Sequence, residues 1–314
     1  MDERLLACLP DALLGAEMRI ERVNQGMSGA GVYRVFANGR SYVLKVARDD
    51  EAPEDWRRMT QVLTAAGKAG VGPEVVHANE TTKSVVMTFI EGDSFLPTYF
   101  NPATAPKAFE DLAGTLRTIH AIPLQPGWTP KDAPVAMGYV LKGLQGNGGV
   151  PKFAEEVFER IKSSRLPPPD RPLTLCHNDL NPSNLIFANG RLMLLDWDQA
   201  RPNEPFYDVA AVSLFLRMSD EQCLALLSAY ERKPVASLPE RFRYHRRVVA
   251  GFCGTIFLHL ARLGGAPGNI DQTAQDTDSL SEAYGKLRNK LLDLSKPEDR
   301  WRFGLSFLKE SLAI

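Results

Sequence analysis

Alternating apolar and polar side chains dominate the first ninety residues and predict a small antiparallel β-sheet. Five strands are predicted, at residues 18–23, 32–36, 41–47, 74–77 and 84–89. Asn38-Gly39, between the second and third strands, favours a two-residue hairpin turn. Residues 53–69 carry acids at their start and a lysine near their end, which indicates a helix. Residues 3–16 predict one or two short helices ahead of the sheet.

Helical periodicity takes over after a break at residues 91–93. Apolar side chains then recur at spacings of three and four residues. Helices are predicted at residues 109–120, 152–161, 207–230, 240–263, 279–293 and 299–311. Residues 264–278, rich in glycine and polar side chains, predict a mobile loop. The pattern predicts an α+β protein with a small lobe of residues 1–90, a sheet with one helix, and a larger, mainly helical lobe of residues 91–314.

The chain has 314 residues, more than one ordinary core needs, which agrees with two lobes. Its 37 Lys and Arg and 38 Asp and Glu side chains leave a formal net charge of -1, so we expect no nucleic-acid partner and no membrane partner. Four widely spaced cysteines are typical of reduced thiols. Early acidic residues and the lack of a long apolar run predict a cytoplasmic protein. The oligomeric state stays open.

A polar turn at residues 177–184 lies between two apolar runs, and a second acidic cluster follows soon after it. A hairpin turned at Asn189-Gly190 would return Asp196 to the side of Asn184. An amide oxygen beside a carboxylate suits Mg²⁺, which takes oxygen ligands. Asp179, left off the metal, can orient a hydroxyl group and accept its proton. The alternative is an Asx turn, in which these side chains only bond the backbone.

A glycine-rich loop lies between the first two predicted strands and contains Gly26, Ser28 and Gly29. Its backbone N–H groups could face a phosphate, although such a loop alone is more often only a turn. Lys45 lies inside the third strand and could reach beneath this loop to nucleotide phosphates, although a strand lysine usually lies on a solvated face. A glycine-rich loop, a strand lysine, a catalytic turn and a metal aspartate, in this order, indicate a kinase-like phosphotransferase.

The two polar clusters resemble the signature of the aminoglycoside phosphotransferase and choline kinase superfamily. They read His177-Asn178-Asp179-Leu180-Asn181-Pro182-Ser183-Asn184 and Leu195-Asp196-Trp197-Asp198. The resemblance implies a protein-kinase-like fold of two lobes, in which the N-terminal lobe binds the nucleotide. The C-terminal lobe would hold the catalytic loop and the acceptor site. The implied activity is transfer of the γ-phosphoryl group of ATP to a hydroxyl group of a small-molecule alcohol.

The resemblance also implies the roles of single residues. Asp179 would be the catalytic base, while Asn184 and Asp196 would hold Mg²⁺. Lys45 would contact the α- and β-phosphates of ATP. The residues implied to bind the rest of the nucleotide are Gly26, Ser28 and Gly29, which would cover the phosphates, and Thr88 and Ile90, whose backbone groups would pair with adenine.

The sequence departs from the family pattern in the helix at residues 53–69. The family usually pairs its strand lysine with a glutamate of this helix, but the middle of the helix carries no acid. Glu54 or Asp55, one turn earlier, could reach Lys45 or only complement the helix dipole. Asp198 has no assigned role. A protein kinase is disfavoured because Trp-Asp, not Phe-Gly, follows the metal aspartate and no Ala-Pro-Glu segment is present.

The acceptor stays open at this point. The two clusters look nearer to bacterial choline, ethanolamine and thiamine kinases, and the main alternative is an aminoglycoside phosphotransferase. A choline-like head group would need aromatic faces, and a polycationic aminoglycoside would need many acids. The candidates, each also explained by packing or solvation, are the aromatic Trp197, Tyr207, Tyr244, Trp301 and Phe303 and the acidic Glu204, Asp220, Glu221, Asp271, Asp276 and Asp278. A nucleotide-binding pseudokinase or scaffold is the alternative from another class.

Overall fold

The structure is a computed structural model that describes residues 3–15, 17–23, 31–166, 169 and 171–314. The chain forms two compact units. The first unit combines Met1–Thr129 with Thr174–Pro202, and the second combines Pro130–Leu173 with Asn203–Ile314. The predicted division into lobes of residues 1–90 and 91–314 follows a different boundary and stays a prediction.

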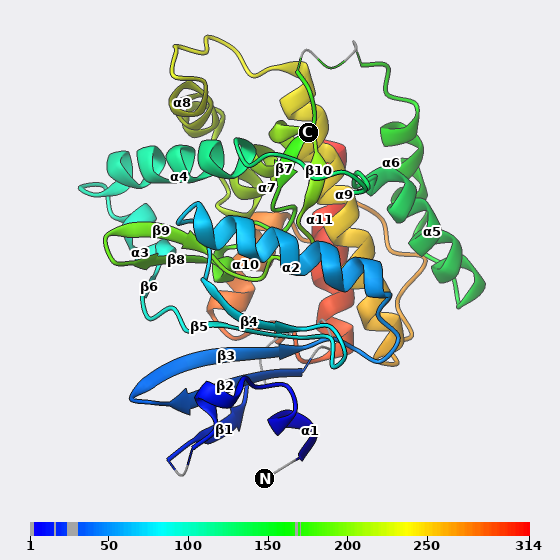
Figure 1. Cartoon of the computed structure of the whole chain (residues 1–314). Coiled ribbons are helices and arrows are strands. Elements are labelled where there is room, and N and C mark those ends of the chain that lie inside the picture. Colours follow the sequence, from blue (N-terminus) through cyan, green and yellow to red (C-terminus); the bar gives the residue numbers. More distant parts are fainter. Residues whose placement is uncertain (1–2, 16, 24–30, 167–168, 170) are drawn as a thin grey trace. The chain divides into compact units, whose positions relative to one another are not determined.

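A five-stranded antiparallel sheet opens the first unit, in the strand order β1-β2-β3-β5-β4 (Figure 1). Its strands are β1 (Arg19–Arg22), β2 (Gly31–Ala37), β3 (Arg40–Val46), β4 (Val75–Asn79) and β5 (Ser84–Thr88). The turn between β2 and β3 places Asn38 (φ 52°) and Gly39 (φ 70°) in the left-handed region, which Asn-Gly adopts readily. The predicted strands and hairpin are confirmed.

The N-terminal segment, with helices α1 (Glu3–Leu6) and η1 (Asp11–Leu13), packs against the sheet. The buried side chains of this core are Cys8, Leu9, Leu13, Met18, Val35, Ala37, Leu44 and Val86. Their burial stabilises the fold by about 25 cal/mol for each Å² of apolar surface removed from water. Leu44 belongs to this core, and alternation along β3 therefore turns the neighbouring Lys45 toward the opposite face of the sheet.

Helix α2 (Pro53–Lys68) lies beside β4 (Figure 1). Pro53 suits the first helical position because its φ is preset and its missing N–H would have no partner there. Acidic side chains in the first turn and Lys68 in the last turn complement the helix dipole. The apolar side chains buried along the helix are Trp56, Met59, Val62, Leu63 and Ala66. The helix also buries one charged side chain, Arg58.

The rest of the first unit carries the polar clusters. Its elements are β6 (Asp93–Ser94), α3 (Phe95–Phe100), α4 (Ala105–His120), β7 (Thr174–Cys176), η2 (Pro182–Asn184), β8 (Leu185–Ala188), β9 (Arg191–Leu194) and the start of β10 (Arg201–Asn203). β8 lies between β6 and β9 in a second antiparallel sheet. The β8–β9 turn falls at Asn189 (φ 52°) and Gly190 (φ 73°), which confirms the predicted hairpin.

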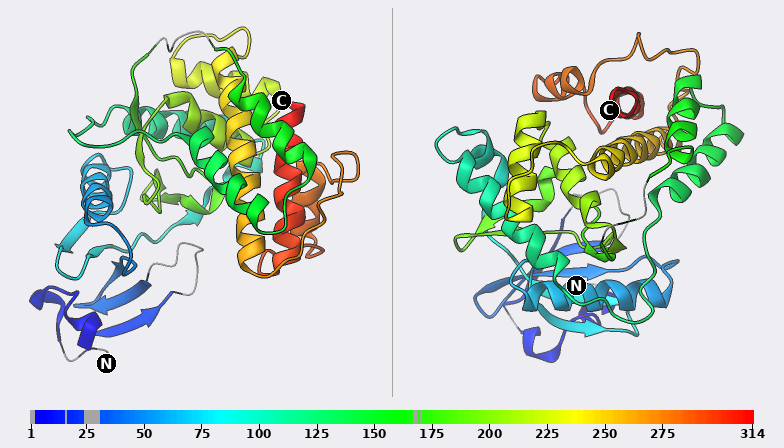
Figure 2. Two further views of the ribbon diagram at one scale, coloured as in Figure 1. Left: turned by 90° about the vertical axis from the view of Figure 1, so that its right-hand side faces the viewer. Right: turned by 90° about the horizontal axis from the view of Figure 1, so that it is seen from above.

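The second unit is helical. Its helices are α5 (Ala133–Gly146), α6 (Lys152–Lys162), α7 (Pro205–Phe215), α8 (Asp220–Glu231), α9 (Glu240–Leu263), α10 (Leu280–Arg288) and α11 (Pro297–Ala313). Helices α9 and α11 lie side by side (Figures 1 and 2). They approach closely at Gly254 and Gly304, where a Cβ on either residue would come within 2.8 Å of the carbonyl oxygen of the other.

Two helix predictions in this unit need correction. The helix predicted at residues 207–230 is two helices, because Arg217 turns to a φ of 53° and Ser219 then starts α8 with a capping box. Helix α5 was not predicted, although Asp132 caps it by accepting from the N–H of Val135 at 2.9 Å. Among the described residues, no helix combines the length and the apolar character that crossing a membrane requires.

Glu204 links the start of α7 to α9, and its ion pairs give a testable stability effect. Its carboxylate accepts from Arg241 Nε at 2.7 Å and also from Arg241 Nη2, and it lies 3.2 Å from His245 Nε2. The contact with His245, and then the hydrogen bonds from Arg241, outweigh burial and lower the pKa of Glu204 from an ordinary 4.5 to about 2. Because the folded pKa is depressed, this stabilisation is present above about pH 4.5 and is lost as the pH falls toward 2.

We therefore expect Glu204→Gln to reduce the free energy of unfolding at pH 7 by about 1–2 kcal/mol, less than the full pKa shift would give because solvent screens the partly exposed pair. The loss should shrink toward pH 2. Urea unfolding of both proteins across this range measures it. Glu221→Gln, on the exposed side of α8, is the control and should change stability by less than about 0.5 kcal/mol. A loss that is equal at every pH would contradict the assignment.

Candidate active site

His177 fixes the backbone at the start of the polar turn. Its ring is fully buried and lies 4.8 Å from the ring of Trp197, centroid to centroid. The N–H of Asp179 donates to His177 Nδ1 at 3.3 Å, so the ring proton sits on Nε2, which donates to the carbonyl oxygen of Leu195 at 2.9 Å. The imidazole thus joins the turn that carries Asp179 to the end of the strand that leads to Asp196.

Asn178 makes a second connection between the same two segments. Its backbone has a φ of 64°, a left-handed conformation that asparagine tolerates better than most residues. Its side-chain Nδ2 lies 3.1 Å from each of three carbonyl oxygens, those of Cys176, Gln199 and Arg201. Together the two side chains connect the polar turn to the acidic cluster.

The Asp179 carboxylate accepts hydrogen bonds from two amides of its own turn. Asn181 Nδ2 donates to Oδ1 at 3.1 Å, and Asn184 Nδ2 donates to Oδ2 at 3.3 Å. Asn184 Nδ2 also donates to the backbone oxygen of Asp179 at 2.8 Å. Asx-type bonds are therefore present, but they use only the nitrogen of Asn184. The side-chain oxygen of Asn184 is the atom left to act as a ligand.

The β8–β9 hairpin brings Asp196 back to the polar turn. Leu185 pairs with Leu194, and the N–H of Leu195 donates to the oxygen of Asn184 at 3.0 Å. Asp196 follows directly, in a left-handed conformation with a φ of 58°. Its side chain is 44% exposed, so the carboxylate is accessible to a ligand. The structure thus brings Asp196 to the neighbourhood of Asn184, where the hairpin prediction placed it.

Lys45 extends from β3 to the acidic cluster. Its Nζ lies 3.1 Å from Asp196 Oδ1 and also donates to Asp198 Oδ1. Burial acts to lower the pKa of Lys45, but the carboxylates of Asp198 and Asp196 outweigh it, and the pKa is raised. The side chain of Lys45 therefore stays protonated and positively charged. It offsets the repulsion between two neighbouring carboxylates.

The acidic partner of Lys45 is not on helix α2. Asp55 pairs instead with Arg58 at 3.4 Å and with Arg201 at 3.3 Å. In the described part of the chain Lys45 pairs with Asp196 and Asp198, so the alternative that Glu54 or Asp55 reaches it is wrong, and the helix-dipole interpretation of these two acids is the one left. The partner Asp198 lies 153 residues along the chain from Lys45, so only tertiary contact could reveal it. The sequence analysis also did not identify Arg58 as a residue of the site. The only sign of it in the sequence is that arginines, and no acid, occupy the middle of the helix.

The predicted nucleotide-binding residues are only partly described. Gly26, Ser28 and Gly29 lie outside the residues that the structure describes. In the hinge segment 88–91, the N–H of Thr88 donates to the oxygen of Glu74 at 2.9 Å. In the described part of the chain, the N–H of Ile90 makes no backbone hydrogen bond. Their contact with adenine stays a prediction.

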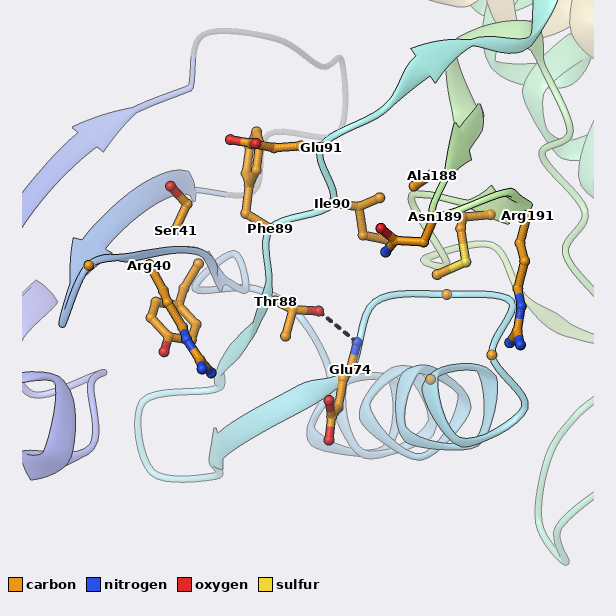
Figure 3. A pocket seen from close by; sticks show the side chains of 16 residues that line it. Arg40, Ser41, Glu74, Thr88, Phe89, Ile90, Glu91, Ala188, Asn189 and Arg191 are labelled. Atoms are coloured by element: carbon orange, nitrogen blue, oxygen red, sulfur yellow. Dashed lines mark hydrogen bonds between the residues drawn. The ribbon is translucent and has the colours of Figure 1, made fainter.

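A cavity of about 800 Å³ adjoins the hinge segment (Figure 3). Figure 3 shows the side chains of Thr88 and Ile90 on the side of the hinge that faces Glu74 and Asn189. The walls come from the hinge, the β2–β3 turn, the loop between α2 and β4, and the β8–β9 turn. Thr88 and Ile90, the residues predicted to meet adenine, line this cavity, whereas Lys45, Asn184 and Asp196 do not.

The acidic cluster suits Mg²⁺ by its donor set. An amide oxygen of Asn184 and a carboxylate of Asp196 are hard oxygen ligands, and the exposure of Asp196 leaves room for water and phosphate oxygens to complete the coordination. The carboxylate of Asp179 accepts hydrogen bonds from the side-chain amides of its own turn. The arrangement can therefore place a metal, a fixed cation and a proton acceptor in one small region.

Most acceptor candidates are used within the protein. The aromatic candidates Trp197, Tyr207, Trp301 and Phe303 are at most 3% exposed, which supports the packing interpretation. The ammonium of Lys131 lies 5.6 Å from the centre of the Tyr207 ring, so the chain itself supplies a cation there. Among the acidic candidates, Glu204 pairs with Arg241 and Asp278 pairs with Lys286.

The fold belongs to the protein-kinase-like class. The model of the phosphotransferase enzyme family matches residues 19–245, and the chain belongs to this family. It is 36% identical over 55 residues to Protein LicA of Haemophilus influenzae, a match that covers 18% of this chain and 21% of LicA. The chain thus spans about a fifth of the length of this curated relative.

Two solved structures share the fold. A choline/ethanolamine kinase family protein from Mesorhizobium loti is 19% identical, with 98% of each chain covered and a TM-score of 0.58. An aminoglycoside-3′-phosphotransferase of type VIII is 21% identical, with 80% of this chain and 98% of that chain covered and a TM-score of 0.58. The family match confirms the predicted superfamily, and these structures confirm the α+β, protein-kinase-like fold.

Proposed function

We propose that the protein transfers the γ-phosphoryl group of ATP to a hydroxyl group of a small molecule. The observation that carries this proposal is the position of Lys45 within 3.1 Å of Asp196, on a segment that His177 and Asn178 fix to the turn of Asp179. A metal ligand, a phosphate-binding cation and a proton acceptor then share one site, as in-line phosphoryl transfer requires. The family membership supports the same reaction.

In this proposal each side chain has one task. Asp179 orients the acceptor hydroxyl and takes its proton late in the reaction, while the amides of Asn181 and Asn184 hold its carboxylate in place. Asn184 and Asp196 would hold Mg²⁺, which neutralises phosphate charge when it is bound. Lys45 turns from the carboxylates toward the α- and β-phosphates. Positioning and charge stabilisation supply most of the acceleration.

For the acceptor we propose an amino alcohol such as choline or ethanolamine, or thiamine. The sequence match to LicA and the fold shared with a protein of the choline/ethanolamine kinase family support this class. An aminoglycoside is the second candidate, because an aminoglycoside phosphotransferase shares the fold with the same TM-score. The internal pairing of Glu204 and Asp278 leaves fewer acids to bind a polycation and favours the smaller acceptor.

A coupled assay of ADP release tests both parts of the proposal. We expect Mg²⁺-dependent turnover that an amino alcohol or thiamine stimulates at least about tenfold over ATP alone. Stimulation by aminoglycosides alone would keep the reaction but reject the acceptor class. The purified Asp179→Ala variant is the control for contaminating kinases. If no alcohol of either class stimulates turnover while nucleotide still binds, the protein is a nucleotide-binding scaffold and the proposed reaction is wrong.

A further inference from the structure

Arg58 is a buried cation on the face of helix α2 that meets the acidic cluster. Its side chain is 9% exposed. Its Nη1 donates to the carbonyl oxygen of Ala200 at 2.5 Å, and its Nη2 donates to the carbonyl oxygen of Asp198 at 3.3 Å. These two carbonyls lie in the segment that follows Asp196. The guanidinium therefore binds the backbone of the acidic cluster, although Arg58 and Asp198 are 140 residues apart in the chain.

The carboxylate partner of Arg58 is shared. Asp55, one turn earlier on α2, lies 3.4 Å from Arg58 Nη2 and 3.3 Å from Arg201 Nη2. Arg58 Nε has no hydrogen-bond partner among the described residues. Burying a guanidinium that shares its carboxylate partner with a second arginine costs free energy unless its remaining donors form hydrogen bonds. The carbonyls of Asp198 and Ala200 each accept from one of these donors, but only while residues 198–200 keep their present path.

That path decides where two carboxylates point. Asp198 uses its backbone oxygen for Arg58 and its side chain for Lys45. Asp196, two residues earlier, holds a left-handed conformation that a non-glycine residue keeps only when its surroundings impose it. The N–H of Ala200 closes the turn by donating to the oxygen of Trp197 at 3.0 Å. Without the Arg58 contacts, Asn178 would be the side chain left among the described residues to hold the backbone at Gln199 and Arg201, and the carboxylates that face Lys45 would be held less firmly.

We propose that Arg58 is a positioning residue, which holds residues 198–200 so that Asp196 and Asp198 face Lys45. The effect on Mg²⁺ rests on the proposed metal role of Asp196, whereas the effect on the loop itself does not. Arg58 of helix α2 thus binds the backbone of Asp198, and the side chain of Asp198 binds Lys45 of β3.

Arg58→Met tests this role, because it keeps a long side chain for packing and removes all five donors. Arg57→Met is the matched control, since Arg57 is the preceding residue of the helix but is 54% exposed and pairs with Glu80 at the surface. Arg58→Lys keeps the charge and loses the two-pronged geometry. This conservative variant also serves if Arg58→Met does not fold.

Two measurements separate positioning from a general loss of structure. Hydrogen exchange resolved by peptide should show exchange at residues 197–201 accelerated at least about tenfold in Arg58→Met, with α2 itself still protected. Calorimetry with ADP, with and without Mg²⁺, should show the Mg²⁺-dependent gain in affinity reduced about 10- to 100-fold, the usual effect of losing an outer partner of a metal ligand. Affinity without Mg²⁺ should change less than about threefold. Arg58→Lys should fall between wild type and Arg58→Met in both measurements.

Unchanged exchange at residues 197–201 in Arg58→Met or Arg58→Lys would overturn the inference. So would an equal acceleration across the whole of α2 and the sheet, because that result indicates ordinary core packing. A wild-type protein whose ADP affinity ignores Mg²⁺ would instead contradict the proposed function. In that case the exchange measurement still decides whether Arg58 positions the loop.

Discussion

Asp179→Ala should reduce kcat about 10²- to 10⁴-fold with the preferred acceptor, the range expected when a general base is removed. The amides of Asn181 and Asn184 hold the Asp179 carboxylate, and among the described residues it forms no ion pair. Without it, the acceptor hydroxyl loses both its orientation and its proton acceptor. Steady-state assays of ADP release measure the effect.

Nucleotide binding separates this result from misfolding. Asp179→Ala should bind ADP with Mg²⁺ within about threefold of wild type, because Asn184 and Asp196 remain. Asp50→Ala is a suitable control, since Asp50 is 78% exposed and pairs only with the neighbouring Arg48 among the described residues. If purified Asp179→Ala keeps kcat within tenfold of wild type, Asp179 is not the base.

Asp196→Ala should abolish Mg²⁺-dependent nucleotide binding and lower turnover at least about 10²- to 10³-fold, because the site loses its charged metal ligand and the charge stabilisation that depends on it. Stability should change by less than about 1 kcal/mol, since the carboxylate is 44% exposed and Lys45 keeps Asp198 as a partner. Calorimetry with ADP at varied Mg²⁺ measures the first effect, and thermal unfolding measures the second.

The comparison with Asp179→Ala is informative. Asp179→Ala should lose turnover and keep Mg²⁺-dependent binding, whereas Asp196→Ala should lose both. An Asp196→Ala protein whose ADP affinity still rises with Mg²⁺ as in wild type would place the metal elsewhere. Asp198 would then be the first residue to test, because it lies beside the same lysine.

Local sequence signals predicted much of the fold. Period-two alternation gave the five strands, and Asn-Gly turns placed both hairpins because asparagine and glycine accept a positive φ at little cost. Failures occurred where local signals were weak. Helix α3 is only six residues long, and the break between α7 and α8 depends on a single left-handed arginine at residue 217.

The candidate site divides in the same way. The sequence by itself determined the polar turn, the return of the chain to Asp196 and the family, because these depend on neighbours within about twenty residues and on turn geometry. Only the tertiary structure decided that Asp198 pairs with Lys45 and that Arg58 grips the backbone beside it. Those contacts join residues about 140 to 150 positions apart, and burial, not local preference, selects such partners because an unpaired buried charge is too costly to keep.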